Sequence, residues 1–492
     1  MRVRLRWYEV AAVITILLGA PAAGRAQTWR EVRGDHFIVL SDAPERRVRS
    51  IAWQFEQMRS AMAEGLPWTT PTLDRPVIVI AARDENGMRA LAPQFWEQRG
   101  GTRPTSVFVG GPDAYYIALR ADVQVTAQLQ NPHAAAYWAY SGLVLQRALG
   151  RRLPLWLTNG LAAVLSNTIV RNNEVEFGRP QPWMAERAKE GPRLPLPALF
   201  AVDHGSPSYR GGVDRERFDA QTWALVQFLI FGNKDNAAAR FDQLIGQLAA
   251  GVPSEQAVTA VYGSVAALDE AYLLYVHQGV YSYSRLPTDT AIVEAQLPAR
   301  VADPADHMAS RAAFHVAMNR PAEARALIAA ARQADPASPA ADTVEAVLLD
   351  REQQPDEARK LFAKAAEAGS SSFWTYYRLA TLQASGRMTP DDQAAIEPWL
   401  ERAAALNPRF APAWAFLADI QGNGGQTDAA IESARRAVAL DGGNVTHALR
   451  LVRLLAAASR SDEARAVAEQ ALPLADAQQR QLFEAILAGS AK

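Results

Sequence analysis

The feature that most constrains this 492-residue chain is a 34-residue recurrence in its last third. Ala324, in the string Pro-Ala-Glu-Ala, recurs at a 34-residue interval as Ala358 in Pro-Asp-Glu-Ala. Ala430 and Ala464 are separated by the same interval. Two antiparallel helices approach closely only where small residues lie between them, so the pattern predicts a series of stacked helical hairpins.

This period is the length of a tetratricopeptide repeat. Asp335-Pro336, Asn407-Pro408 and Asp441-Gly442 close successive units, and we expect about five hairpins between residues 305 and 490. The polar sequence after Leu472 predicts a capping helix. Such arrays present a concave groove, so we expect a protein or peptide partner to bind there.

Residues 1–26 have the pattern of a secretory signal. Arg2, Arg4 and Arg6 precede an apolar run, Val10–Ala20, that is too short to span a bilayer comfortably. Small residues around Ala26 then predict cleavage after that residue. We expect an exported protein, periplasmic or secreted, with an uncleaved N-terminal anchor as the alternative. No later segment reaches the length of a membrane span, so we expect no integral membrane segment after cleavage.

Composition excludes several kinds of site. The chain has no cysteine, which rules out disulfides, cysteine-based metal sites and cysteine nucleophiles. The formal net charge is -1, without the clustered basic excess of a nucleic-acid-binding protein, so we expect no nucleic-acid partner. Apolar residues make up 49% of the chain, which is enough for a sizeable buried core.

Before the repeats, the pattern predicts a small α+β layer followed by helices. Apolar runs predict strands at His36–Leu40 and Arg75–Ala81, and Ser106–Gly110 and Tyr115–Arg120 predict a hairpin. From residue 133 onward the pattern becomes helical. The segment 171–215 is rich in proline, glycine and charge and predicts long loops, and 281–305 predicts a linker.

Three stretches of this region carry a family resemblance. They are Gly111–Arg120, the pair Tyr137–Leu145 and Leu153–Ala163, and Phe218–Gly232. The string LPLWLTNGLAA within Leu153–Ala163 is the most distinctive. On these motifs, residues 28–290 resemble the secreted zinc metallopeptidase-like domains of the peptidase MA-like, or gluzincin, group, which often occur fused to tetratricopeptide repeats.

The resemblance places a zinc site whose ligands this chain lacks. In the family, His-Glu-x-x-His on one helix supplies two zinc ligands and the general base, and a glutamate on the next helix is the third ligand. The corresponding positions here are Trp138, Ala139, Gly142 and Asn159, and a later glutamate position is Ala163. None of these side chains is a good zinc ligand, so we expect no metal and no other cofactor.

Together these observations predict a zincin-like α+β domain that has lost catalysis, followed by an all-α solenoid, in a predominantly helical protein. We expect a signal peptide at 1–26, the peptidase-like domain at 27–290, a linker at 291–304 and the repeats at 305–492. In this scheme the repeats form a unit that can be removed without unfolding the N-terminal domain.

Other chemistry finds little support in the sequence. No two of the seven histidines are spaced i, i+4, and neither Gly-x-Ser-x-Gly nor a phosphate-binding loop occurs. We interpret His204 as a solvated loop residue, His133 as part of a helix-entry turn, and His307 and His315 as helix-surface residues. Tyr140 and Trp156, with Trp138, either line an aromatic cleft or belong to the core.

The function predicted from sequence is therefore that of an exported, non-catalytic interaction or scaffold protein. It would combine a pseudo-metallopeptidase domain with a partner-binding repeat array. The alternatives are a cryptic hydrolase or peptidase that uses an unrecognised site, and a purely structural scaffold of an envelope complex. Metal content distinguishes the hydrolase from the other two.

The signal pattern gives a direct prediction. Exported protein should begin at Gln27, because signal peptidase reads the small residues that end at Ala26. N-terminal sequencing of material recovered from outside the cytoplasm measures this. Retention of the full-length chain in the cytoplasm would contradict the prediction.

Overall fold

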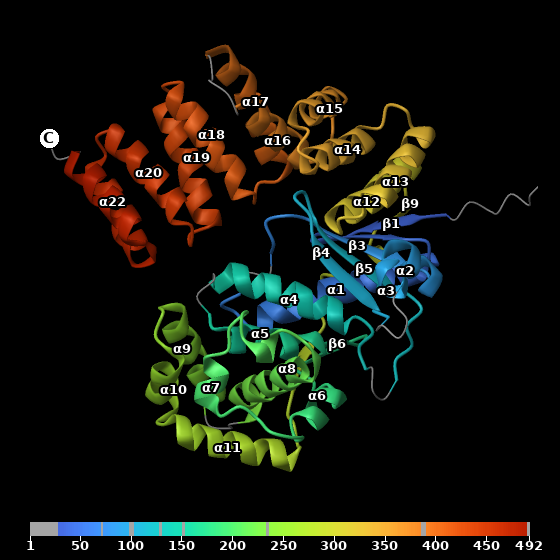
Figure 1. The fold of residues 1–492 in the computed structure, drawn as a ribbon, viewed down its shortest axis with the longest axis vertical. Helices are drawn as coiled ribbons and strands as arrows, with labels where there is room; N and C mark the ends of the chain where they lie inside the picture. Colours follow the sequence, from blue (N-terminus) through green and yellow to red (C-terminus); the bar gives the residue numbers. More distant parts are fainter. Residues whose placement is uncertain are drawn as a thin grey trace, which may run out of the picture.

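A computed structural model describes residues 28–69, 72–97, 103–126, 130–149, 153–232, 236–384 and 390–489. The predicted signal peptide and its cleavage site lie outside these residues. The protein is predominantly helical, as predicted, with a small sheet in its N-terminal half (Figure 1). Among the described helices, none combines the length and the apolar character needed to cross a membrane.

A six-stranded mixed sheet organises the N-terminal half. Its strand order is β4-β5-β3-β2-β1-β9. Strands β2, β3 and β5 run parallel to one another, and β1, β4 and β9 pair antiparallel with their neighbours. The predicted β4–β5 hairpin is confirmed. The bounds are β1 (Arg30–Arg33), β2 (Phe37–Ser41), β3 (Val77–Ala82), β4 (Ser106–Gly110), β5 (Tyr115–Arg120) and β9 (Ala299–Val301).

Helices and a second, three-stranded sheet complete this half. The strands of the second sheet are β6 (Ile169–Val170), β7 (Glu174–Phe177) and β8 (Ser284–Pro287). The helices are α1 (Glu45–Gly65), α2 (Glu85–Leu91), α3 (Gln94–Glu97), α4 (Ala134–Leu149), α5 (Leu155–Ser166), α6 (Pro182–Arg187), α7 (Leu196–Phe200), α8 (Gly212–Gln227), α9 (Ala237–Ala249), α10 (Ser254–Tyr262) and α11 (Val265–Gln278).

The segment 171–215 is more regular than we expected. It holds β7, α6, α7 and a short 3-10 turn, Pro207–Tyr209, rather than long loops alone. Three of its six prolines, Pro182, Pro197 and Pro207, fall in the first turns of these helices, where the missing backbone N–H leaves no hydrogen bond unmade. These three prolines therefore mark helix starts, which a reading of proline as a loop residue overlooks.

Both faces of the large sheet are buried. Along β3, Val77, Val79 and Ala81 join the core beneath α1, α4 and α5, whereas Ile80 and Ala82 join a second core on the opposite face. Successive side chains of a strand point to opposite faces, so the uninterrupted apolar run of β3 requires cover on both sides.

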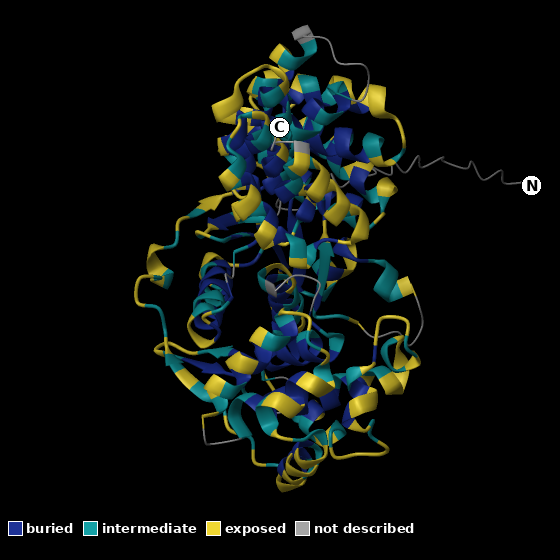
Figure 2. Ribbon diagram, turned by 90° about the vertical axis from the view of Figure 1, so that its left-hand side faces the viewer, coloured by how far each residue is buried: buried dark blue, intermediate teal, exposed yellow. Residues whose placement is uncertain are grey.

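The first repeat helix and α2 together cover the second face. Phe314 of α12 (Pro304–Ala317) is fully buried and makes an edge contact with the Tyr116 ring of β5, with ring centroids 6.5 Å apart. Ala309 and Ala312 of the same helix belong to this core, together with Met88 of α2. Figure 2 shows buried residues both in the repeats and in the sheet-containing half. The two halves therefore share a hydrophobic core.

The segment 291–304, which we expected to be a linker, is part of the fold. Its strand β9 pairs with β1, and Asp303 caps α12 by accepting hydrogen bonds from the Ala305 and Asp306 backbone N–H groups. Trp29, just before β1, accepts a backbone hydrogen bond from Ala302. The chain thus passes from the edge strand β9 directly into the first repeat helix, and no flexible linker separates the two in the described residues.

The repeats form five helical hairpins and a terminal helix in the described part of the chain, as predicted. In Figure 1 they arch over the sheet-containing half. The hairpins are α12 with α13 (Pro321–Ala334), α14 (Pro339–Arg351) with α15 (Pro355–Glu367), α16 (Phe373–Gln383) with α17 (Pro390–Leu406), α18 (Ala411–Asn423) with α19 (Thr427–Leu440), and α20 (Val445–Ala457) with α21 (Ser461–Ala471), followed by α22 (Ala477–Gly489).

The 34-residue register is visible in the packing. Ala324, Ala358, Ala430 and Ala464 are all fully buried, at the second helix of their hairpins. The turn between the two helices contains a residue of positive φ at equivalent places, Asn319 and Gln353 in the first two hairpins and Gly425 and Ser459 in the last two. The members of each pair have the same 34-residue spacing, which confirms the predicted period.

Substitution of the buried Phe314 tests whether packing of the repeats stabilises the sheet. Phe314→Ala should cost about 3–5 kcal/mol of the free energy of unfolding, because it leaves a cavity in the shared core. Hydrogen exchange should accelerate in β5, because the Tyr116 ring of that strand contacts Phe314. The matched control is Phe483→Ala in α22, an equally buried phenylalanine far from the sheet. Unchanged exchange of β5 in the Phe314 variant would show that the two halves are independent.

Candidate functional site

The helix pair α4 and α5 carries the positions that the family resemblance assigns to zinc chemistry. Helix α5 is enclosed between α4 and α8. A Cβ atom on Gly160 would lie 2.5 Å from the Thr222 carbonyl oxygen, so only glycine permits this approach of α5 to α8. The glycine in the string LPLWLTNGLAA therefore has a packing role in this fold.

The three predicted positions on α4 are only half-buried. Trp138 packs against the edge of the main core, and Ala139 and Gly142 lie on the same half-exposed side of the helix. A Cβ atom built on Gly142 meets no other residue within 4 Å. The side of α4 that carries Tyr137 is the one that packs fully into the core.

Asn159, at the predicted third-ligand position, is part of a hydrogen-bond network with α8. Its Nδ2 donates to Asp219 at 3.0 Å and to the Thr222 hydroxyl at 2.8 Å. Arg215 forms an ion pair with Asp219 at 2.7 Å. Burial raises the pKa of Asp219, while the charge of Arg215 and these hydrogen bonds lower it. The amide therefore ties α5 to α8.

The two aromatic residues considered as cleft lining have different surroundings. Trp156 is fully buried, and its Nε1 donates to the Ser254 hydroxyl at 3.1 Å. Tyr140 is also buried, but it lines a cavity between the two halves of the molecule. Its ring lies 5.2 Å from that of Phe37 at the start of β2.

This cavity, which we call the junction cavity, has a volume of about 770 Å³. One wall consists of the amino ends of β2, β3 and β5, and the other of α12, the first turn of α14 and the segments that lead into α16 and α18. Its volume falls within the range of roughly 300–1,000 Å³ that is usual for ligand sites. Neither half of the molecule encloses it alone.

A histidine–glutamate pair lies at the sheet wall of the junction cavity. Glu56 of α1 accepts hydrogen bonds from His36 Nδ1 at 2.8 Å and from the His36 backbone N–H at 2.8 Å. The Phe37 N–H donates to the same carboxylate. A Cβ atom on Gly34 would lie 2.5 Å from Glu56 Oε1, so glycine makes room for this carboxylate. The arrangement fixes the orientation of the His36 ring.

A carboxylate and the imidazole that it orients are two of the three members of a catalytic triad. The other requirement is a nucleophile within hydrogen-bond reach of the second ring nitrogen. Within the described ranges, the hydrogen bonds of the His36 side chain involve Glu56 and no hydroxyl group. No group of three or more potential metal ligands occurs there either. The pair is therefore suited to accept or donate a hydrogen bond at the cavity wall.

His307 and His315 of α12 are buried, not exposed as we expected from sequence. Only 8% of His307 and 2% of His315 is accessible, because α12 packs against the sheet. The His307 ring stacks on Trp29 at 5.0 Å and lines the junction cavity. Burial lowers the pKa of His307 to about 4. Its imidazole is thus neutral at neutral pH.

The remaining histidine interpretations have mixed outcomes. His204 is exposed in its loop, as expected, and its ring contacts Tyr209. His133 immediately precedes α4, in the entry position, but it is completely buried, beside Phe55 and Tyr137. Burial lowers the pKa of His133 to about 3. This residue is a neutral core side chain.

The repeat wall of the junction cavity is rich in hydroxyl groups. Thr343 of α14 and Thr375 of α16 have hydroxyl oxygens 2.8 Å apart, and Ser370 contacts both. All three are buried. This network holds the start of α16 against α14 and positions the exposed Ser371 at the cavity.

Charges around the junction cavity balance. Glu31 is shared by Arg33 and Arg300, at 3.2 and 3.0 Å. Four arginines and four acidic residues line the cavity, which gives a formal sum of zero: Arg33, Arg75, Arg300, Arg409, Glu31, Asp35, Asp113 and Asp306. With apolar walls such as Phe37 and Phe373, the cavity suits a ligand of mixed polarity without strong net charge.

Comparisons with known proteins identify no family. No family model matches the chain, and no curated protein has a similar sequence. Similar solved structures include YrrB, described as a TPR protein with an unusual peptide-binding site, at 19% identity and a TM-score of 0.31, covering 37% of this chain and 91% of YrrB. MamA protein shows 19% identity and a TM-score of 0.28, covering 35% of this chain and 91% of MamA.

Pseudomonas aeruginosa pilF shows 16% identity and a TM-score of 0.30, covering 38% of this chain and 88% of pilF. These TM-scores are too low to carry an argument about this chain. The assignment of tetratricopeptide-like repeats therefore rests on the five hairpins and on their 34-residue register.

Sequence reasoning missed most of the junction cavity. His36 and Glu56 lie on different elements, a strand and a helix, and His307 belongs to the distant repeats. The local signals were Gly34 before a strand and a histidine at its start, which are too common to single out a site. Only the packing of α12 on the sheet brings these residues to one place.

The buried His307 gives a prediction for stability against pH. Its folded-state pKa of about 4 lies below the ordinary value of 6.5, so the unfolded chain binds a proton that the folded chain does not. The stabilisation is complete above pH 6.5 and is lost as the pH falls toward 4. The free energy of unfolding, measured with urea, should therefore fall more steeply over that pH range for wild type than for His307→Phe. The phenylalanine of this variant keeps the stacking on Trp29. Parallel curves would contradict the prediction.

Proposed function

We propose that the protein is an exported, non-catalytic interaction protein that holds a peptide segment of a partner in the junction cavity. The repeats form one wall of the site and the sheet the other. The observation that carries this proposal is the joint cavity itself, charge-balanced and bounded by both halves. Arrays of helical hairpins use their inner surfaces to bind extended peptides and helices, which supports a peptide as the ligand.

The chemistry of the walls fits a peptide. Its backbone amides need hydrogen-bond donors and acceptors, which Ser371, His36 and His307 offer at the cavity. Its side chains need apolar contacts, which Phe37 and Phe373 supply. Polyanions such as nucleic acids need a net positive surface, and the formal sum of zero at this cavity does not favour them.

The peptidase-like ancestry of residues 27–290 and the export of the chain belong to the same proposal. The motifs around α4 and α5 support the ancestry, and Trp138, Ala139, Gly142 and Asn159 at the ligand positions support loss of zinc chemistry. The Asn159–Asp219 network, with its packing role, is consistent with a helix pair retained for structure. Export rests on the pattern of residues 1–26.

Site-specific photocrosslinking tests the peptide site. A photoreactive residue at Ser371, which is exposed at the cavity, should capture a defined partner in the producing cell, and one at Ala405, exposed on α17 and outside the cavity, should not. Ala340→Trp, at the cavity wall, should abolish the crosslink because the indole occupies the site. Ala405→Trp is the matched control for an added tryptophan.

Thermal unfolding of both tryptophan variants verifies that the fold is retained. The proposal is contradicted if capture is equal at the two positions, or if Ala340→Trp with an unchanged melting temperature still captures the partner. Retention of zinc after dialysis, together with peptidase activity removed by a chelator, would instead support the alternative of a hydrolase.

A further inference from the structure

A second cavity, of about 710 Å³, opens at the opposite end of the sheet. It lies beyond the carboxyl end of β5, between the first turns of α1 and α4 and the strand β6. In open sheets with parallel strands, ligands bind in crevices at the carboxyl ends of the strands. The side chains that line this cavity include Arg47, Arg171 and Arg179, and we call it the arginine cavity.

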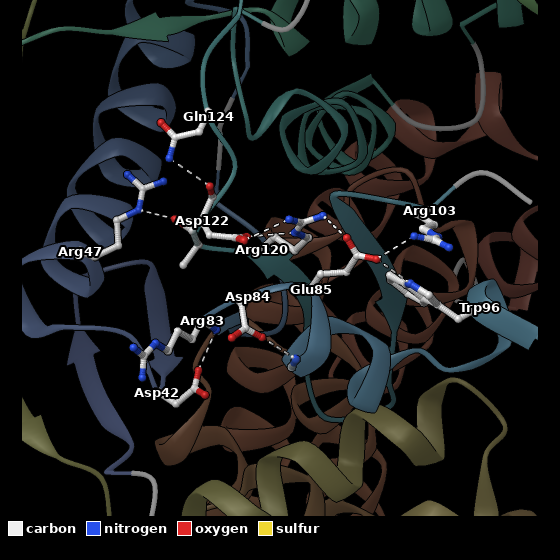
Figure 3. Close-up of polar contacts among 12 residues, drawn as sticks. Asp42, Arg47, Arg83, Asp84, Glu85, Trp96, Arg103, Arg120, Asp122 and Gln124 are labelled. Carbon is white, nitrogen blue, oxygen red and sulfur yellow. Dashed lines mark hydrogen bonds and ion pairs between the residues drawn. The ribbon is translucent and has the colours of Figure 1, made fainter.

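Arg47 is a half-buried cation without a matching anion. Its Nε donates to the Ala121 carbonyl oxygen at 2.8 Å. The nearest acidic side chain, Asp122, is already engaged by two hydrogen bonds of 3.0 Å from Arg120 (Figure 3). Within the described residues, Arg47 forms no ion pair. Burial lowers the pKa of Arg47, and the charge of Asp122 offsets only part of this effect.

The other two arginines share a single carboxylate. Arg171 Nε pairs with Glu176 at 2.9 Å, and Arg179 pairs with the other oxygen of the same group. Glu176 is buried behind them and does not line the cavity. Two positive charges therefore meet one negative charge, which leaves a surplus of one. With Arg47, the formal charge around the cavity is +2.

Nothing in the described lining neutralises this charge. The lining contains no aspartate or glutamate, in contrast to the balanced junction cavity. The 16-residue helix α4 also begins at this cavity, where Asn131 and Pro132 lead into its first turn. The partial positive charge of a helix N-terminus adds to the field of the arginines.

We propose that the arginine cavity binds a small dianion, a phosphomonoester or a dicarboxylate, with Arg47 and Arg171 as the principal contacts. A half-buried guanidinium without an anionic partner is costly, and an oxyanion with two oxygens satisfies its remaining N–H groups in the bidentate manner that arginine favours. The charge of -2 on the ligand matches the surplus of the site. This site is separate from the junction cavity and independent of the peptide proposal.

Calorimetric titration of the full mature chain tests the proposal. Inorganic phosphate and succinate are the two dianionic probes, and acetate is the monoanion, all at equal ionic strength. Saturable binding of at least one dianion is expected, and which of the two binds more tightly identifies the ligand class. Arg47→Gln should weaken that binding about tenfold or more, as expected for loss of a charge-assisted hydrogen bond.

Arg89→Gln is the matched control, because Arg89 is an exposed arginine of α2 outside the cavity. Arg171→Gln provides a second test if the Arg47 variant does not fold. Without ligand, Arg47→Gln should keep the melting temperature of wild type and lose its rise on addition of the dianion. Absence of saturable dianion binding, or equal binding by folded cavity variants and the Arg89 control, overturns the proposal.

Discussion

The contact between α12 and the sheet is the interaction on which the rest of the architecture depends. The parallel strands β2, β3 and β5 carry apolar side chains on both faces, and α1, α4 and α5 cover only one of them. Without Phe314 and the alanines of α12, the second face would keep only the cover that α2 gives it, and each Å² of apolar surface exposed on Leu40, Ile80 and Tyr116 would cost roughly 25 cal/mol. The first repeat helix therefore belongs to the core of the N-terminal half. Strand β9, which pairs with β1, fixes where the chain enters that helix.

The same contact creates the junction cavity. Helix α12 brings the first turn of α14 and the segments before α16 and α18 over the amino ends of the strands. The Asn407 side chain donates to the Asp74 carbonyl oxygen at 2.7 Å, a second link between the array and the sheet-containing half. An array tied at two places keeps its inner surface opposite the sheet. A ligand in this cavity touches both halves, so its binding would also stabilise their arrangement.

The two cavities differ in the physics that selects a ligand. Around the junction cavity the charges of opposite sign are equal in number, so hydrogen bonds and apolar contacts determine what binds there. In the arginine cavity the surplus positive charge is the main feature, and electrostatic attraction selects the ligand. Between them lies the helix pair α4–α5, in which Asn159 and Gly160 serve the contact with α8. The surfaces suited to ligands thus lie beside the positions that the family resemblance assigns to zinc ligands, not at them.

Local patterns in the sequence determined the repeats and four strands of the large sheet, β2, β3, β4 and β5. The 34-residue recurrence of Ala324, Ala358, Ala430 and Ala464 specifies where helices must approach closely, and each of these residues is fully buried. The apolar run of β3 likewise specifies a strand covered on both faces. The sequence did not reveal which element supplies the second cover, because that contact joins segments far apart along the chain. Only the tertiary structure decided that His307 is buried, that 299–301 is a strand and that Arg47 lacks an anion, since each depends on what distant segments place beside it.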